Sequence, residues 1–141
     1  MNIVRLDEHL AIRQDLFKTI KIIENTELVY SFSLNFGYSV VVTYGDNKTY
    51  TLLTSTSLDA CKFTYFKYLY LFSIEKEVGV LEFDAEDKDW FRYLIKDFRA
   101  RESRLAKVFT STTGKGYASA INGLRDVFRD RIKKYVLNKY Q

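Results

Sequence analysis

The apolar residues near the start of the chain recur at helical spacing. Residues 6–24 gather seven of them on one side of a helix, which predicts an amphipathic α-helix that Asp7 caps. These residues are Leu6, Leu10, Ile12, Leu16, Phe17, Ile20 and Ile23. His9, the only histidine, falls on or near this apolar face. A single histidine there is expected to be a packed side chain rather than a catalyst or a metal ligand.

The pattern then changes to a period of two, which predicts β-strands with one solvent-facing side. Two turns divide this region. Gly37 allows a tight turn, and the Gly-Asp-Asn sequence at residues 45–47 is a hairpin signal because these residue types tolerate positive φ. The strands expected on either side of the two turns cover residues 28–36, 38–44 and 48–54.

Residues 62–74 are apolar and aromatic without a clear period, so a strand and a helix both remain open. We favour the strand because of the aromatic content and because a turn at residues 75–77 would lead into a short strand at 78–83. The β region would then be an antiparallel meander of four to five strands.

Two amphipathic helices are expected in the last third of the chain. The first begins at Asp84, which forms a capping-box pattern with Asp87, and runs to about Val108. The second covers residues 117–135 and has the clearest helical period of the sequence. The predicted fold class is therefore α+β, with an N-terminal helix, the antiparallel meander and two C-terminal amphipathic helices packed on the sheet.

Composition supports a compact protein. The chain has 141 residues, of which 47% are hydrophobic, and it contains no proline. This length suits a single α+β domain over residues 1–141. Cys61 is the only cysteine, so no internal disulfide can form, and a buried, unreactive thiol is expected. The first residues lack the apolar run of a signal peptide, and residues 58–74 are interrupted by charges, so we expect a cytoplasmic protein without membrane contact.

The net charge of +4 hides a strong asymmetry along the chain. Residues 1–91 contain 9 Lys and Arg against 14 Asp and Glu, a net charge of −5. Residues 92–141 contain 13 against 4, a net charge of +9. This polarity favours an anionic partner for the C-terminal part or a match between the two parts. The candidate phosphate-binding residues are Arg92, Lys96, Arg99, Lys107, Lys115, Arg125, Arg129, Lys133 and Lys134.

Residues 110–116 combine hydroxyl residues, two glycines and a lysine just before the last helix. Free backbone N–H groups at a helix start attract anions, although a plain connector between two helices explains the composition as well. The series Thr113-x-Lys115-x-Tyr117-x-Ser119 that opens the helix resembles the helix openings of small DNA-contacting domains in recombinases and some restriction proteins. The β-rich region before it departs from those families, and no residue role is carried over.

These features predict a small non-catalytic protein that binds DNA or RNA through the phosphates. The alternative is a protein–protein interaction module, for example an assembly or inhibitor protein of a phage or mobile element, with the basic end docking an acidic partner or a second copy. A nuclease that uses Asp84, Glu86 and Lys88 is a third hypothesis, because the last two form a Glu-x-Lys pattern. We expect no cofactor and no metal.

Overall fold

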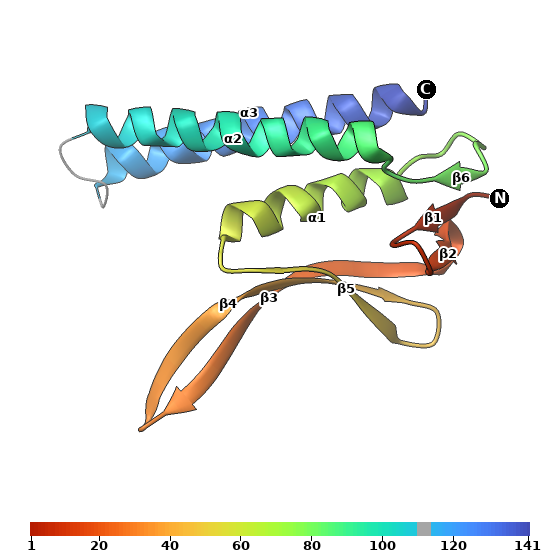
Figure 1. Cartoon of the computed structure of the whole chain (residues 1–141), viewed down its shortest axis with the longest axis horizontal. Coiled ribbons are helices and arrows are strands. Elements are labelled where there is room, and N and C mark those ends of the chain that lie inside the picture. Colours follow the sequence, from red (N-terminus) through yellow and green to blue (C-terminus); the bar gives the residue numbers. More distant parts are fainter. Residues whose placement is uncertain (110–113) are drawn as a thin grey trace. The chain divides into compact units, whose positions relative to one another are not determined.

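The computed structural model, shown in Figure 1, describes residues 1–109 and 114–141. The described residues form an α+β structure of three α-helices and two three-stranded sheets. They divide into two compact units. Unit 1 comprises Met1–Glu82 and Val136–Gln141, and unit 2 comprises Phe83–Tyr135. The single domain that the length predicts stays a prediction.

The larger sheet of unit 1 is an antiparallel meander of three consecutive strands, β3 (Phe17–Val29), β4 (Phe32–Tyr44) and β5 (Lys48–Ser55). The central strand carries the core, since Val40 and Val42 are fully buried. This meander replaces the expected one of four to five strands. The hairpin between β4 and β5 lies where it was predicted, with Gly45 at φ 57° and Asn47 at φ 62°.

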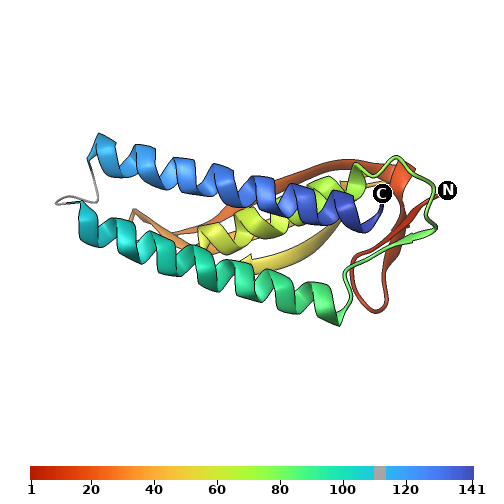
Figure 2. The same ribbon diagram turned by 90° about the horizontal axis from the view of Figure 1, so that it is seen from above.

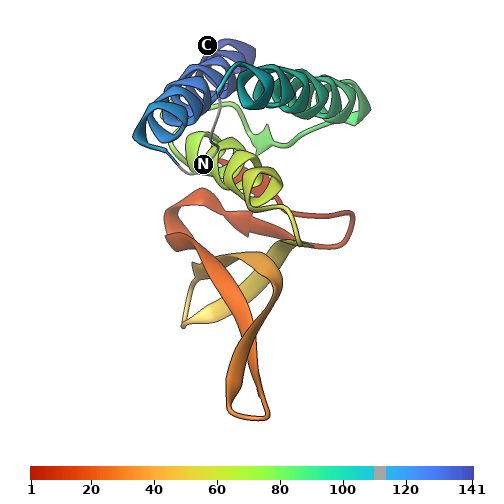
Figure 3. The same cartoon turned by 90° about the vertical axis from the view of Figure 1, so that its left-hand side faces the viewer.

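The helix α1 (Leu58–Phe72) lies along this sheet (Figures 1 and 3). Ser57 caps its start by accepting a hydrogen bond from the Ala60 amide. Cys61 is fully buried in α1, as expected, and burial raises the pKa of its thiol. The strand favoured for residues 62–74 is therefore wrong. No residue of α1 is exposed, so the helix lacks the polar stripe that makes a helical period visible in a sequence.

The hairpin of β3 and β4 extends beyond β5, because β4 pairs with β5 only from Tyr38 to Tyr44 (Figure 3). Residues 24–36 therefore form a two-stranded ribbon. Its turn lies at Tyr30 and Ser31, which have φ values of 50° and 69°. The strand predicted over 28–36 with a turn at Gly37 is wrong, because the turn at Tyr30 and Ser31 contains no Gly, Pro, Asn or Asp that would mark it in the sequence.

The predicted N-terminal helix is also wrong, because residues 6–24 contain strands. After β1 (Ile3–Arg5), the chain forms β2 (Ala11–Arg13), the short 3₁₀ helix η1 (Gln14–Leu16) and then β3. The β-branched residues at the start of β3 pair with the valines of β4 instead of facing a helical core.

Asp7 stabilises the turn between β1 and β2 rather than a helix. Its Oδ1 accepts hydrogen bonds from the amides of His9 and Leu10, and the Tyr50 hydroxyl donates to its Oδ2. The Tyr50 hydrogen bond is the main reason why the pKa of Asp7 is lowered. His9 is exposed in this turn, so its expected place on an apolar helix face is wrong as well.

The smaller sheet of unit 1 joins distant parts of the chain. Here β1 pairs antiparallel with β2 and parallel with β6 (Val80–Leu81), so the predicted short strand is found outside the meander. The buried Asn2 side chain supports this sheet, because its Oδ1 accepts hydrogen bonds from the amides of Val78 and Gly79.

Unit 2 consists of two antiparallel helices, the whole of α2 and most of α3 (Figure 2). The helix α2 (Ala85–Val108) starts after Asp84 as predicted, with both hydrogen bonds of the capping box present. The helix α3 (Lys115–Lys139) contains the predicted helix over 117–135 and is longer at both ends.

Candidate nucleic-acid interface

The first turn of α2 is fixed to α3 by buried polar and aromatic contacts. Asp87 is buried, and its Oδ1 accepts a 2.6 Å hydrogen bond from the Tyr135 hydroxyl. Burial, together with this hydrogen bond, raises the pKa of Tyr135. The Trp90 ring stacks on Tyr135 with 3.9 Å between the ring centroids.

The acidic residues at this helix start therefore have a structural role. Asp84 and Asp87 are held in the capping box, and no group of three or more His, Cys, Asp or Glu residues that could hold a metal ion occurs in the described part of the chain. Asp84, one of the acidic residues proposed for a nuclease, is thus already engaged in the helix cap, because its Oδ1 accepts a hydrogen bond from the Asp87 amide.

An aromatic and ionic contact holds the middle of the helix pair. The Phe98 ring meets the fully buried Phe128 ring edge to face at 5.3 Å. Asp97 on α2 accepts hydrogen bonds from Arg131 on α3 at 2.9 Å and from Arg101 at 3.3 Å. The Arg131 hydrogen bond is the largest cause of the lowered pKa of Asp97. These contacts define the side of each helix that faces the other.

Four of the predicted phosphate-binding residues lie on α2 and form the α2 stripe: Arg92, Lys96, Arg99 and Lys107. All four are exposed, and at about 100° per residue they fall within about 80° of the helix circumference. Arg92 pairs with Asp89 at 2.9 Å. The side chains of the other three make no hydrogen bond or ion pair with another described residue. With about 1.5 Å of rise per residue, the stripe extends over about 22 Å.

The other five candidates lie on α3. Lys115, Arg125, Arg129 and Lys133 share one sector of this helix, while Lys134 lies about 100° from Lys133 and pairs with Asp130 at 3.1 Å. The Arg125 guanidinium donates to the Asn122 side chain. The α3 cations are thus more engaged with neighbouring side chains than those of α2.

The two sets of cations do not form one surface. Asp97 and Phe98, which contact α3, lie about 120° and 140° from the centre of the α2 stripe in opposite directions around the helix, so the side of α2 that faces α3 is nearly opposite the stripe. On α3, Phe128 and Arg131 face α2 and lie about 100° and 160° from the centre of the basic sector of that helix. The two basic sectors therefore lie on opposite outer sides of the helix pair, and a single linear ligand would contact one of them.

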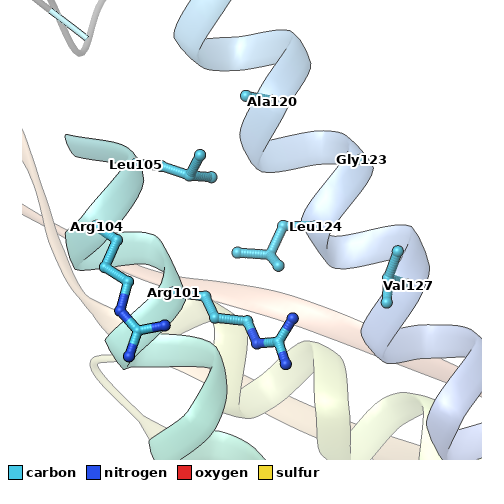
Figure 4. A pocket seen from close by; sticks show the side chains of 7 residues that line it. All are labelled: Arg101, Arg104, Leu105, Ala120, Gly123, Leu124 and Val127. Atoms are coloured by element: carbon cyan, nitrogen blue, oxygen red, sulfur yellow. The ribbon is translucent and has the colours of Figure 1, made fainter. Parts of the chain in front are cut away.

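Two further arginines, which the sequence did not single out, lie beside a shallow groove between α2 and α3 (Figure 4). Arg101 and Arg104 border it on α2, and its volume is about 370 Å³. The remaining lining residues are apolar or glycine: Leu105, Ala120, Gly123, Leu124 and Val127. The sequence does not identify these two arginines as a site, because they lie beside the apolar side of α2 and the groove exists only where α3 packs against α2.

Residues 110–113 of the predicted anion-binding loop lie outside the described residues. Gly114 precedes α3, and the amide of Ala118 donates to its carbonyl. No helix in the described ranges is long and apolar enough to cross a membrane. Comparisons with protein-family models, with curated proteins and with solved structures find no match for this chain.

Proposed function

We propose that this protein is a non-catalytic nucleic-acid-binding protein that holds DNA or RNA by its phosphates through unit 2. The observation that carries the proposal is the α2 stripe, in which Lys96, Arg99 and Lys107 are exposed and have no acidic partner among the described residues. Unit 2 as a whole has 13 Lys and Arg against 8 Asp and Glu, a net charge of +5.

The arrangement of these charges favours a phosphate backbone over simple solvation. A helix surface that serves only solubility usually mixes charges of both signs at spacings of three and four residues. Among the described residues, the α2 stripe forms an ion pair of this kind at its start, between Arg92 and Asp89, while Arg99 and Glu102 have the spacing but form no ion pair. A row of cations over about 22 Å matches a linear polyanion, which gains affinity by releasing counterions. The proposal includes a cytoplasmic location.

Exchanging Lys96 and Arg99 for glutamate is expected to weaken binding of oligonucleotides roughly ten-fold or more at low salt. The slope of log affinity against log salt should become shallower by about 1.4–1.8, because two phosphate contacts are lost. Fluorescence anisotropy with labelled oligonucleotides at several salt concentrations measures both quantities. The matched control exchanges Lys21 and Lys48, two exposed lysines of unit 1, for glutamate. Equal loss in both variants would show that net charge alone matters.

A second candidate function is a protein–protein interaction module, in which the basic helices dock an acidic protein surface. The ribbon of residues 24–36 favours it, because Leu28, Tyr30 and Phe32 are 75%, 91% and 72% exposed. Exposed apolar side chains that lie close together commonly mark interaction sites. Phe32, Leu34 and Phe36 alternate along β4 and share one face of the ribbon.

If the ribbon mediates self-association, the Phe32→Ser variant should shift the protein from dimer to monomer in sedimentation velocity runs at tens of micromolar. Ser33→Ala, on the opposite face of the same strand, serves as the control and should leave the dimer intact. A wild-type protein that stays monomeric at all concentrations would contradict self-association through the ribbon.

A further inference from the structure

The groove between α2 and α3 is lined by apolar side chains and by two arginines. Its floor carries no hydrogen-bonding side chain, since Leu105, Ala120, Leu124 and Val127 supply only carbon atoms. Gly123 leaves the floor open, because a Cβ added there would meet no atom within 4 Å. Val127 is 53% exposed, so an apolar surface faces solvent beside two guanidinium groups.

The two arginines differ in the contacts that their side chains make. Arg101 donates to Asp97, and its guanidinium lies 5.8 Å from the centre of the Phe128 ring. The Arg104 side chain makes no hydrogen bond or ion pair with any other residue that the structure describes. A guanidinium in this state offers its planar donor edge to a phosphate and its face to an aromatic ring.

The groove also adjoins the proposed phosphate-binding surface. Arg104 and Lys107 are three residues apart on α2 and are therefore neighbours on its surface. A chain of phosphates that follows the α2 stripe would reach the groove by way of Lys107 and Arg104. The cavity of about 370 Å³ is near the lower limit for small-molecule sites, which suits one ring system rather than several.

We propose that this groove binds one unstacked base of a single-stranded nucleic acid, with Arg104 holding the adjacent phosphate. The proposal rests on the nucleic-acid-binding function and specifies its substrate as single strands. A duplex keeps its bases stacked, so it can contact the α2 stripe but cannot place a base in the groove. With no donor or acceptor side chain in the floor, the site does not distinguish one base from another.

The test compares the wild-type chain with Gly123→Leu, which fills the groove. This substitution introduces no steric clash at the Cβ, and leucine has a higher helix propensity than glycine, so the variant is expected to fold. Ala118→Leu places a leucine at an exposed position on the opposite side of α3 from the groove and is the control. Arg104→Gln is a second variant that removes the charge and leaves the floor open.

Anisotropy titrations with a labelled oligothymidine and with a duplex of equal length give the readout. Gly123→Leu is expected to weaken single-strand binding by about 5- to 100-fold, the effect of one lost base contact, and to leave duplex binding unchanged. Arg104→Gln should weaken single-strand binding more than duplex binding, and Ala118→Leu should change neither.

Three outcomes overturn the inference, and they are distinguishable. Unchanged single-strand binding in Gly123→Leu rejects the groove while the nucleic-acid function stands. Absence of any binding at low salt rejects both. If the wild type instead binds a peptide of alternating glutamate and phenylalanine, and Gly123→Leu abolishes that binding, the groove belongs to an acidic protein partner.

Discussion

Phe128→Ala is expected to lower the free energy of unfolding by about 3–5 kcal/mol, a large share of the stability of a small protein. Phe128 is fully buried at the centre of the helix pair. Its ring lies 5.3 Å from that of Phe98 and 4.7 Å from the guanidinium carbon of Arg131. Truncation removes the ring from both contacts and leaves a cavity that the two long helices cannot close by a local shift.

Urea unfolding followed by circular dichroism measures this loss. Val127→Ala is the control, because Val127 is adjacent in the sequence and is 53% exposed, so its truncation should change the stability by less than about 1 kcal/mol. A similar small effect of Phe128→Ala would mean that the two helices do not pack through this ring in solution.

Gly37→Ala is expected to destabilise unit 1 by about 2–5 kcal/mol, through two independent effects. The first is conformational, because Gly37 has a φ of 113°, which residues with a side chain rarely adopt. The second is steric, because an added Cβ would lie 2.9 Å from the carbonyl oxygen of Ser55 on β5. This oxygen belongs to the backbone of the sheet, so it cannot move without disturbing the strand.

Gly79→Ala separates these two effects. Gly79 has a similar φ of 104°, but a Cβ added there would meet nothing within 4 Å. We expect this variant to lose only the conformational part, about 1–3 kcal/mol. Thermal unfolding of the two variants beside the wild type provides the comparison. Equal losses would show that β5 does not approach Gly37 as closely as the structure indicates.

The elements that the sequence predicts correctly are those whose signals are local. The capping box of Asp84 and Asp87, the helical period of residues 117–135 and the turn at residues 45–47 each need only a few neighbouring residues. The N-terminal segment and α1 differ from the prediction because their structure depends on distant partners. The β-branched residues of β3 require β4, and α1 has no exposed residue, so its sequence lacks a polar stripe.

The residues of the candidate site likewise divide into those that the sequence identifies and those that only the structure identifies. The α2 stripe follows from residue spacing alone, so Lys96, Arg99 and Lys107 could be named from the sequence. The separation of the α2 and α3 cations could not, because it depends on which side of each helix Asp97 and Arg131 occupy. Arg104 and Gly123 acquire their candidate role only from the contact between helices that places them at one groove.

The path of the chain through unit 1 has a consequence for its folding during synthesis. Residues 136–141 belong to unit 1, where the Tyr140 hydroxyl donates to the carbonyl of Glu82 and accepts from its amide. Strand β1 likewise can pair with β6 only after Val80 has been synthesised. A ribosome therefore produces the whole of unit 2 before unit 1 can be completed. Unit 1 contains the residues that are synthesised first, but it is completed last. All residues of unit 2 are available before the last residues of unit 1 have been synthesised.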